Sequence, residues 1–60
     1  MQKFHIKQNS SDQYYWTLVA SNGETMAKCS EYHPRKSTVT DAIAWMKKYT
    51  SNAEVVDDTE

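Results

Sequence analysis

The sequence is short of the residues that hold small domains together. Among its 60 residues there is one cysteine, Cys29, so no disulfide can form within the chain. A lone thiol argues against a secreted scaffold built on disulfides, and we interpret Cys29 as a small buried side chain rather than a reactive nucleophile. The histidines His5 and His33 are not spaced with Cys29 as zinc ligands are, so we expect no metal site.

Glycine and long apolar runs are scarce as well. Gly23 is the only glycine, which excludes a glycine-rich phosphate-binding loop. The chain has no stretch of about 18 apolar residues that would predict a transmembrane helix. The first residues lack the apolar core of a signal peptide, so we expect a cytoplasmic protein. With a net charge of −1 and both signs mixed along the chain, the composition gives no support to sequence-independent nucleic-acid binding.

The chain has room for a single domain, residues 1–60, with a small core. A domain of about 60 residues buries only about 60% of the surface that its unfolded chain exposes. Such domains usually add disulfides, a metal or a second subunit. Because a disulfide within the chain is excluded and no metal site is expected, the sequence predicts a homodimer.

Three segments have the character of β-strands. Residues 3–8 alternate polar and apolar side chains with a period of two. Residues 13–20 are rich in β-branched and aromatic side chains, and residues 25–30 form a third candidate. The wholly polar residues 9–12 predict the turn between the first two strands.

The pair Asn22-Gly23 predicts how the second and third strands meet. Asparagine and glycine are preferred in the two-residue type I′ turn, because both positions need positive φ. With these two residues as the loop, Ser21 lies opposite Glu24. The face that we expect to pack on a helix then holds Tyr14, Trp16, Leu18, Ala20, Ala27 and Cys29, with Leu18 opposite Ala27.

The other face of the predicted sheet is less polar than a solvent-facing surface should be. It carries Tyr15, Val19 and Met26 beside Thr17 and Lys28. An antiparallel sheet covered by one helix normally presents a polar back to water. We therefore expect a second copy of the chain to cover Tyr15, Val19 and Met26.

A helix follows the third strand. Ser37 is the expected N-cap with Asp41 in the first turn, although Pro34 could instead occupy the first helical position. One apolar stripe recurs at helical spacing, formed by Val39, Ala42, Ile43 and Met46. Trp45 lies off the centre of this stripe and either seals the helix flank or meets a partner.

Residues 53–57 have the pattern of a short fourth strand. The element order is then β-β-β-α-β, which is an α+β fold with an antiparallel sheet and one helix, pairing as a dimer.

A longer pattern resembles a known family. The residues are Tyr14-x-Trp16-x-Leu18-x-Ala20-x-Asn22-Gly23-Glu24-x-x-Ala27, followed by Tyr32, Lys36, Ile43 and Ala53-x-Val55-x-Asp57. From Phe4 to Asp57 the chain resembles the YegP-like family of small prokaryotic domains of unknown function. The resemblance implies a β-β-β-α-β module that occurs as a tandem repeat or as a dimer, so a dimer is implied for this single module. The Tyr32–Lys36 segment is one residue longer than usual, and Cys29 replaces the expected serine or glycine.

Three functions follow from these patterns, none of them enzymatic and none requiring a cofactor. No serine lies in a nucleophile elbow, and so short a chain struggles to enclose a large pocket. The first hypothesis is a protein-interaction module whose candidate residues are Tyr15, Val19, Met26 and Trp45. The second is weak single-stranded nucleic-acid binding through the cations that bracket the helix, which are Arg35, Lys36, Lys47 and Lys48, and through rings on the sheet. The third is a structural or stress-related role without a ligand.

Overall fold

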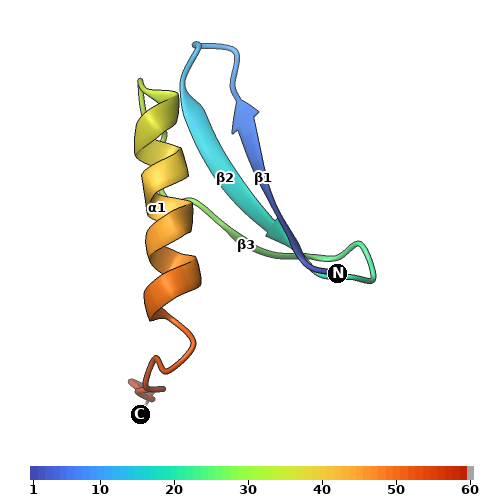
Figure 1. Cartoon of the computed structure of the whole chain (residues 1–60), viewed down its shortest axis with the longest axis vertical. Coiled ribbons are helices and arrows are strands. Elements are labelled where there is room, and N and C mark those ends of the chain that lie inside the picture. The colour runs from blue at the N-terminus through green and yellow to red at the C-terminus, as the bar shows by residue number, and fades with distance from the viewer. Residues whose placement is uncertain (60) are drawn as a thin grey trace.

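The computed structural model describes residues 1–59 and has the predicted α+β architecture. The elements are β1 (Lys3–Gln8), β2 (Tyr14–Val19), β3 (Thr25–Lys28) and α1 (Lys36–Tyr49). The three strands form one antiparallel sheet in the order β1-β2-β3, and α1 lies along one side of it (Figure 1). The first three strands and the helix are therefore confirmed.

The β1–β2 hairpin follows from the alternation of its strands. Phe4 lies opposite Leu18, and Ile6 lies opposite Trp16, so the apolar members of both strands share the face toward α1. The connecting turn is held by Asn9, whose side-chain oxygen accepts hydrogen bonds from the backbone amides of Ser11 (2.9 Å) and Gln13 (3.0 Å).

The turn between β2 and β3 is longer than predicted. The Ala20 amide donates to the Glu24 carbonyl (2.8 Å) and the Gly23 amide to the Ala20 carbonyl (2.9 Å), so Ala20 rather than Ser21 faces Glu24. Among residues 1–59 only Asp12 and Gly23 have positive φ, and Asn22 does not. This is a type I turn followed by a left-handed glycine, and the prediction of a type I′ turn was wrong.

A β-bulge restores the predicted register beyond this turn. Val19 pairs with Thr25 but Leu18 pairs with Ala27, so Met26 is the extra residue of β3. The bulge compensates for the one-residue shift at the turn. Leu18 opposite Ala27 is therefore confirmed, although it arises by a different route.

The helix begins two residues earlier than the expected N-cap at Ser37 implies. Arg35 occupies the N-cap position, and within the described chain it makes no side-chain cap hydrogen bond. Ser37 lies inside the helix and Asp41 lies beyond the first turn, so both parts of the predicted cap were wrong. The cause is a two-way backbone pairing of His33 with Tyr14 (2.7 and 2.8 Å), which anchors the connection to β2 just before Pro34 and the helix.

The predicted fourth strand is not formed. Residues 53–59 have neither helix nor strand, and Val55 and Val56 are 93% and 67% exposed. The chain leaves the far end of α1 and runs away from the sheet (Figure 1), so this segment has no strand edge of its own chain within reach. Within residues 1–59, β1 pairs only with β2, which leaves the other side of β1 open.

Gly23 should be the most sensitive residue of the β2–β3 turn. Its φ of 89° lies in the left-handed region, where a Cβ atom costs energy even though nothing lies within 4 Å to clash with it. We expect Gly23→Ala to lower the free energy of unfolding by about 1 kcal/mol, measured by urea titration. Ser21→Ala in the same turn is the control and should change stability by less than about 0.5 kcal/mol. Equal losses in the two variants would contradict the turn assignment.

Candidate functional site

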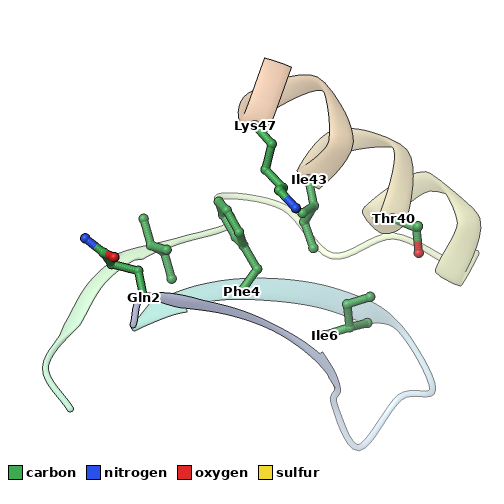
Figure 2. Close-up of a pocket in the computed structure, with 7 residues that line it drawn as sticks. Gln2, Phe4, Ile6, Thr40, Ile43 and Lys47 are labelled. Carbon is green, nitrogen blue, oxygen red and sulfur yellow. The ribbon is translucent and has the colours of Figure 1, made fainter. Parts of the chain in front are cut away.

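An apolar groove opens between the sheet and the helix on the β1 side. Its volume is about 390 Å³. The lining residues are Gln2, Phe4, Ile6, Leu18, Thr40, Ile43 and Lys47. Figure 2 shows Phe4 and Ile6 rising from the sheet while Ile43 and Lys47 extend toward them from α1. The groove runs beside the open edge of β1, so a strand added there would have both backbone partners and an apolar floor.

The opposite face of the sheet is partly covered by the chain itself. The ring of Tyr32 packs edge-on against the ring of Tyr15, with centroids 5.3 Å apart. Lys28 Nζ lies 5.2 Å from the Tyr15 centroid and 5.7 Å from the Tyr32 centroid. Tyr15 is half-buried beneath these groups, Val19 is half-buried at the other end of the face, and Met26 remains 61% exposed. The protomer thus supplies part of the cover that the sequence analysis assigned to a second copy.

Sequence reasoning missed the role of Tyr32 because it treated residues 31–35 only as a connection. The available signal was the need to cover Tyr15 on a sheet face that has no helix of its own. The backbone pairing of His33 with Tyr14 places Tyr32 over the sheet. Local sequence patterns do not predict an isolated bridge of this kind.

Thr17 occupies the centre of this same face. It is only 6% exposed, and its side-chain oxygen has no hydrogen-bond partner among residues 1–59. In register it lies between His5 of β1 and Lys28 of β3. A buried hydroxyl without a partner costs stability, so such a group calls for an explanation.

The four helix-flanking cations that the sequence singled out do not form one cluster. Arg35 and Lys36 lie at the start of α1 and Lys47 and Lys48 in its last turn. The two pairs are separated by about 17 Å of helix, at 1.5 Å per residue. Lys47 lines the groove, and Lys48 Nζ lies 5.2 Å from the centroid of the Tyr49 ring.

Trp45 does not seal the helix flank. It is 58% exposed and lies against Tyr49, itself 56% exposed, with ring centroids 5.6 Å apart. The two rings form an aromatic pair on the outer surface of α1. Of the two roles open to Trp45 in the sequence, contact with a partner is the one that agrees with this exposure.

The Cys29 thiol and the Asp57 carboxylate each take part in local hydrogen bonds. The Cys29 thiol is half-buried and donates to the Glu31 carbonyl oxygen (2.9 Å). Hydrogen bonds from the side-chain hydroxyl and backbone amide of Thr59 lower the pKa of Asp57, which keeps that exposed carboxylate charged. Within residues 1–59 no group of three histidine, cysteine or acidic side chains could hold a metal ion, and no helix could span a membrane.

Comparison with known proteins agrees with this architecture. A family model described as "Domain of unknown function (DUF1508)" matches residues 9–57. The UPF0339 protein Atu0232 of Agrobacterium fabrum is 39% identical over 57 residues, which cover 95% of this chain and 90% of that protein. An NMR solution structure of a protein from Haloferax volcanii superposes with a TM-score of 0.82 at 27% identity, covering 93% of each chain. The NMR structure of protein ATU0232 from Agrobacterium tumefaciens has a TM-score of 0.77 at 34% identity, covering 95% of this chain and 90% of that one.

The buried hydroxyl of Thr17 gives a direct test of the sheet face. Thr17→Val keeps the shape of the side chain and removes the unpartnered oxygen, so we expect the free energy of unfolding to rise by about 1 kcal/mol. Thermal unfolding should show a melting temperature higher by about 4–8 °C for each kcal/mol in a domain of this size. Thr25→Val, at an exposed position of β3, is the matched control and should have little effect. A loss of stability in Thr17→Val would mean that the hydroxyl has a partner.

Proposed function

The chain belongs to the family described as Domain of unknown function (DUF1508), which is the YegP-like family that its sequence resembles, and from that premise we propose that it is a homodimeric protein-interaction module without catalytic activity. The relatives Atu0232 and Atu5359 are named only as UPF0339 proteins, so their names assign no reaction. The observation that carries the proposal is the combination of an open β1 edge with an exposed apolar segment at residues 53–57.

The groove and the C-terminal segment have matching chemistry. The floor of the groove is formed by Phe4, Ile6 and Leu18, and Val55 and Val56 are the most exposed apolar side chains of the C-terminal segment. In an added strand one of these two neighbouring valines faces the groove, and its full burial contributes about 1.5–3 kcal/mol. The segment also carries the acidic residues Glu54, Asp57 and Asp58, whereas Lys47 lies at the groove.

A second copy resolves the conflict between the strand pattern of residues 53–57 and the absence of a strand partner for them within residues 1–59. When this segment leaves one protomer and pairs with β1 of the other, the backbone groups of both are satisfied. The exchange is reciprocal, so one two-fold symmetric contact fills both grooves. This arrangement favours the β1 edge over the Tyr15 face as the dimer contact, because Tyr32 and Lys28 already cover Tyr15.

The aromatic pair on α1 is the surface that remains for a protein partner. Trp45 and Tyr49 lie outside the groove, so a dimer formed at β1 leaves them accessible. Tryptophan and tyrosine are enriched among the residues that dominate binding energy at protein interfaces. The neighbouring cation Lys48, held over the Tyr49 ring, adds a positive charge at the rim.

The dimer is tested by the mass in solution. We expect light scattering to give twice the monomer mass of 7.0 kDa. Replacing both valines, Val55→Asp with Val56→Asp, should give a monomer of lower stability, because the groove is then left open to water. Val19→Lys on the opposite face is the control and should remain dimeric. A parent chain that stays monomeric at every concentration, or a Val19→Lys variant that alone dissociates, would contradict this interface.

The partner surface is tested by comparing matched variants in a pull-down from native lysate. Trp45→Ala should keep the dimer mass and the melting temperature, because the side chain is mostly exposed, but should lose proteins retained by the parent chain. Met26→Lys removes an exposed apolar side chain elsewhere and is the control. If the parent chain retains only itself, or if Trp45→Ala retains the same proteins, the aromatic pair is not an interaction surface.

A further inference from the structure

The sheet face opposite α1 concentrates positive charge in a chain whose net charge is −1. Lys3, His5 and Lys7 alternate along β1, so all three extend from this face, and Lys28 joins them from β3. No strand contains an aspartate or glutamate, and half of the acidic residues follow residue 53. Three of the seven lysines and arginines therefore lie on this sheet face, and half of the acidic residues lie in the C-terminal segment.

The same face also presents aromatic rings. Tyr32 is exposed and stands edge-on against the half-buried Tyr15, with Lys28 above both rings. A depression of about 320 Å³ lies at the other end of the face, where Lys3, His5 and Val19 contribute to its lining. Rings and cations that alternate on an open sheet are the features that bind unpaired bases and their phosphates.

Thr17 adds an independent observation at the centre of this surface. Its side-chain oxygen is buried without a partner between the rows of His5 and Lys28. A ligand atom that reached this hydroxyl would supply the hydrogen bond that residues 1–59 do not.

We propose that this face, formed by Lys3, His5, Lys7, Tyr15, Lys28 and Tyr32, binds single-stranded nucleic acid. The lysines contact phosphates, and Tyr32 stacks on a base. A duplex is disfavoured because its bases are already stacked and paired, and ring contacts of this kind need an exposed base face. This site lies on the other side of the sheet from the groove, so it is independent of the proposed dimer contact.

The expected site is small and its affinity depends on salt. Lys3 and Lys7 are about 13 Å apart along β1, at about 3.3 Å per residue, which suits a site of about four nucleotides. Three lysine–phosphate contacts give a slope of about −2 for the logarithm of the binding constant against that of salt concentration, at about −0.7 per contact. Raising salt from about 50 to 200 mM should therefore weaken binding about 20-fold.

Binding is measured by fluorescence anisotropy with labelled 12-nucleotide oligo(U) and oligo(dT). A mixed-sequence duplex of equal length and heparin are the comparisons. We expect either single strand to bind at low salt more tightly than the duplex and heparin, and the ratio of the two single strands shows whether the sugar matters. Lys3→Gln with Lys7→Gln should reduce the salt slope to about one third, because one contact remains. The matched control is Lys47→Gln with Lys48→Gln on α1, which should leave binding unchanged.

The aromatic contribution has its own variants. Tyr32→Leu keeps an apolar cover over Tyr15 but cannot stack, so we expect it to weaken binding about tenfold. Tyr49→Leu on α1 is the control. Circular dichroism verifies that each variant is folded, and Tyr32→Phe should bind as the parent does because it keeps the ring. The monomeric variant with Val55→Asp and Val56→Asp should also bind the single strands. A result against the proposed dimer can thus be told apart from a result against the nucleic-acid site.

Several results would overturn the site. The first is that neither single strand binds at about 50 mM salt. The second is that heparin binds as tightly as the single strands and Tyr32→Leu has no effect. The third is that binding is lost in the variant of Lys47 and Lys48 but not in the variant of Lys3 and Lys7. The second result would reduce the face to a general attraction for polyanions, and the third would return the contact to the helix.

Discussion

The contact between α1 and the central strand β2 is the interaction on which the rest of the structure depends. Among residues 1–59 the one fully buried apolar side chain is Val39 of α1, and β2 is the strand paired on both sides. Every other element has at least one open side, because a chain of this length cannot cover a sheet completely. The stability of the domain therefore depends on whether water or a binding partner covers each open side.

This constraint divides the molecule into three surfaces with different chemistry. The β1 side has an apolar groove and an unpaired edge, which suit an apolar strand from a second copy. The sheet face opposite α1 is basic and aromatic, and Tyr32 and Lys28 cover Tyr15 on it. The outer surface of α1 presents Trp45 and Tyr49. The three surfaces use different residues, so the proposed dimer contact and the two proposed binding surfaces are compatible.

Local patterns predicted the elements well and their connections poorly. Alternation and composition were sufficient for β1, β2 and β3, because one face of each hairpin must pack on α1. The Leu18–Ala27 pairing was predicted from a two-residue turn that does not form, and it survives because the bulge at Met26 absorbs the extra loop residue. The N-cap was misplaced because the pairing of His33 with Tyr14 decides where the chain leaves the sheet.

The candidate site was harder to predict than the fold, since it depends on residues distant in sequence. Tyr32 reaches Tyr15 only through the bridge at His33, and the basic face combines β1 with β3. Arg35, Lys36, Lys47 and Lys48 bracket one helix, and the length of that helix separates the first pair from the second. Residues 53–57 have a strand pattern but pair with no strand among residues 1–59, so the pattern alone could not place them.

The central claim is that one protomer completes its sheet with residues 53–57 of another. The most direct measurement is a nuclear Overhauser experiment filtered for contacts between chains, on a sample that mixes isotope-labelled and unlabelled protein. We expect contacts between the β1 backbone of one chain and residues 54–56 of the other, together with Val55 or Val56 methyl contacts to Phe4 and Ile6. Contacts of residues 54–56 confined to their own chain, or none at all in a concentrated sample, would contradict the account.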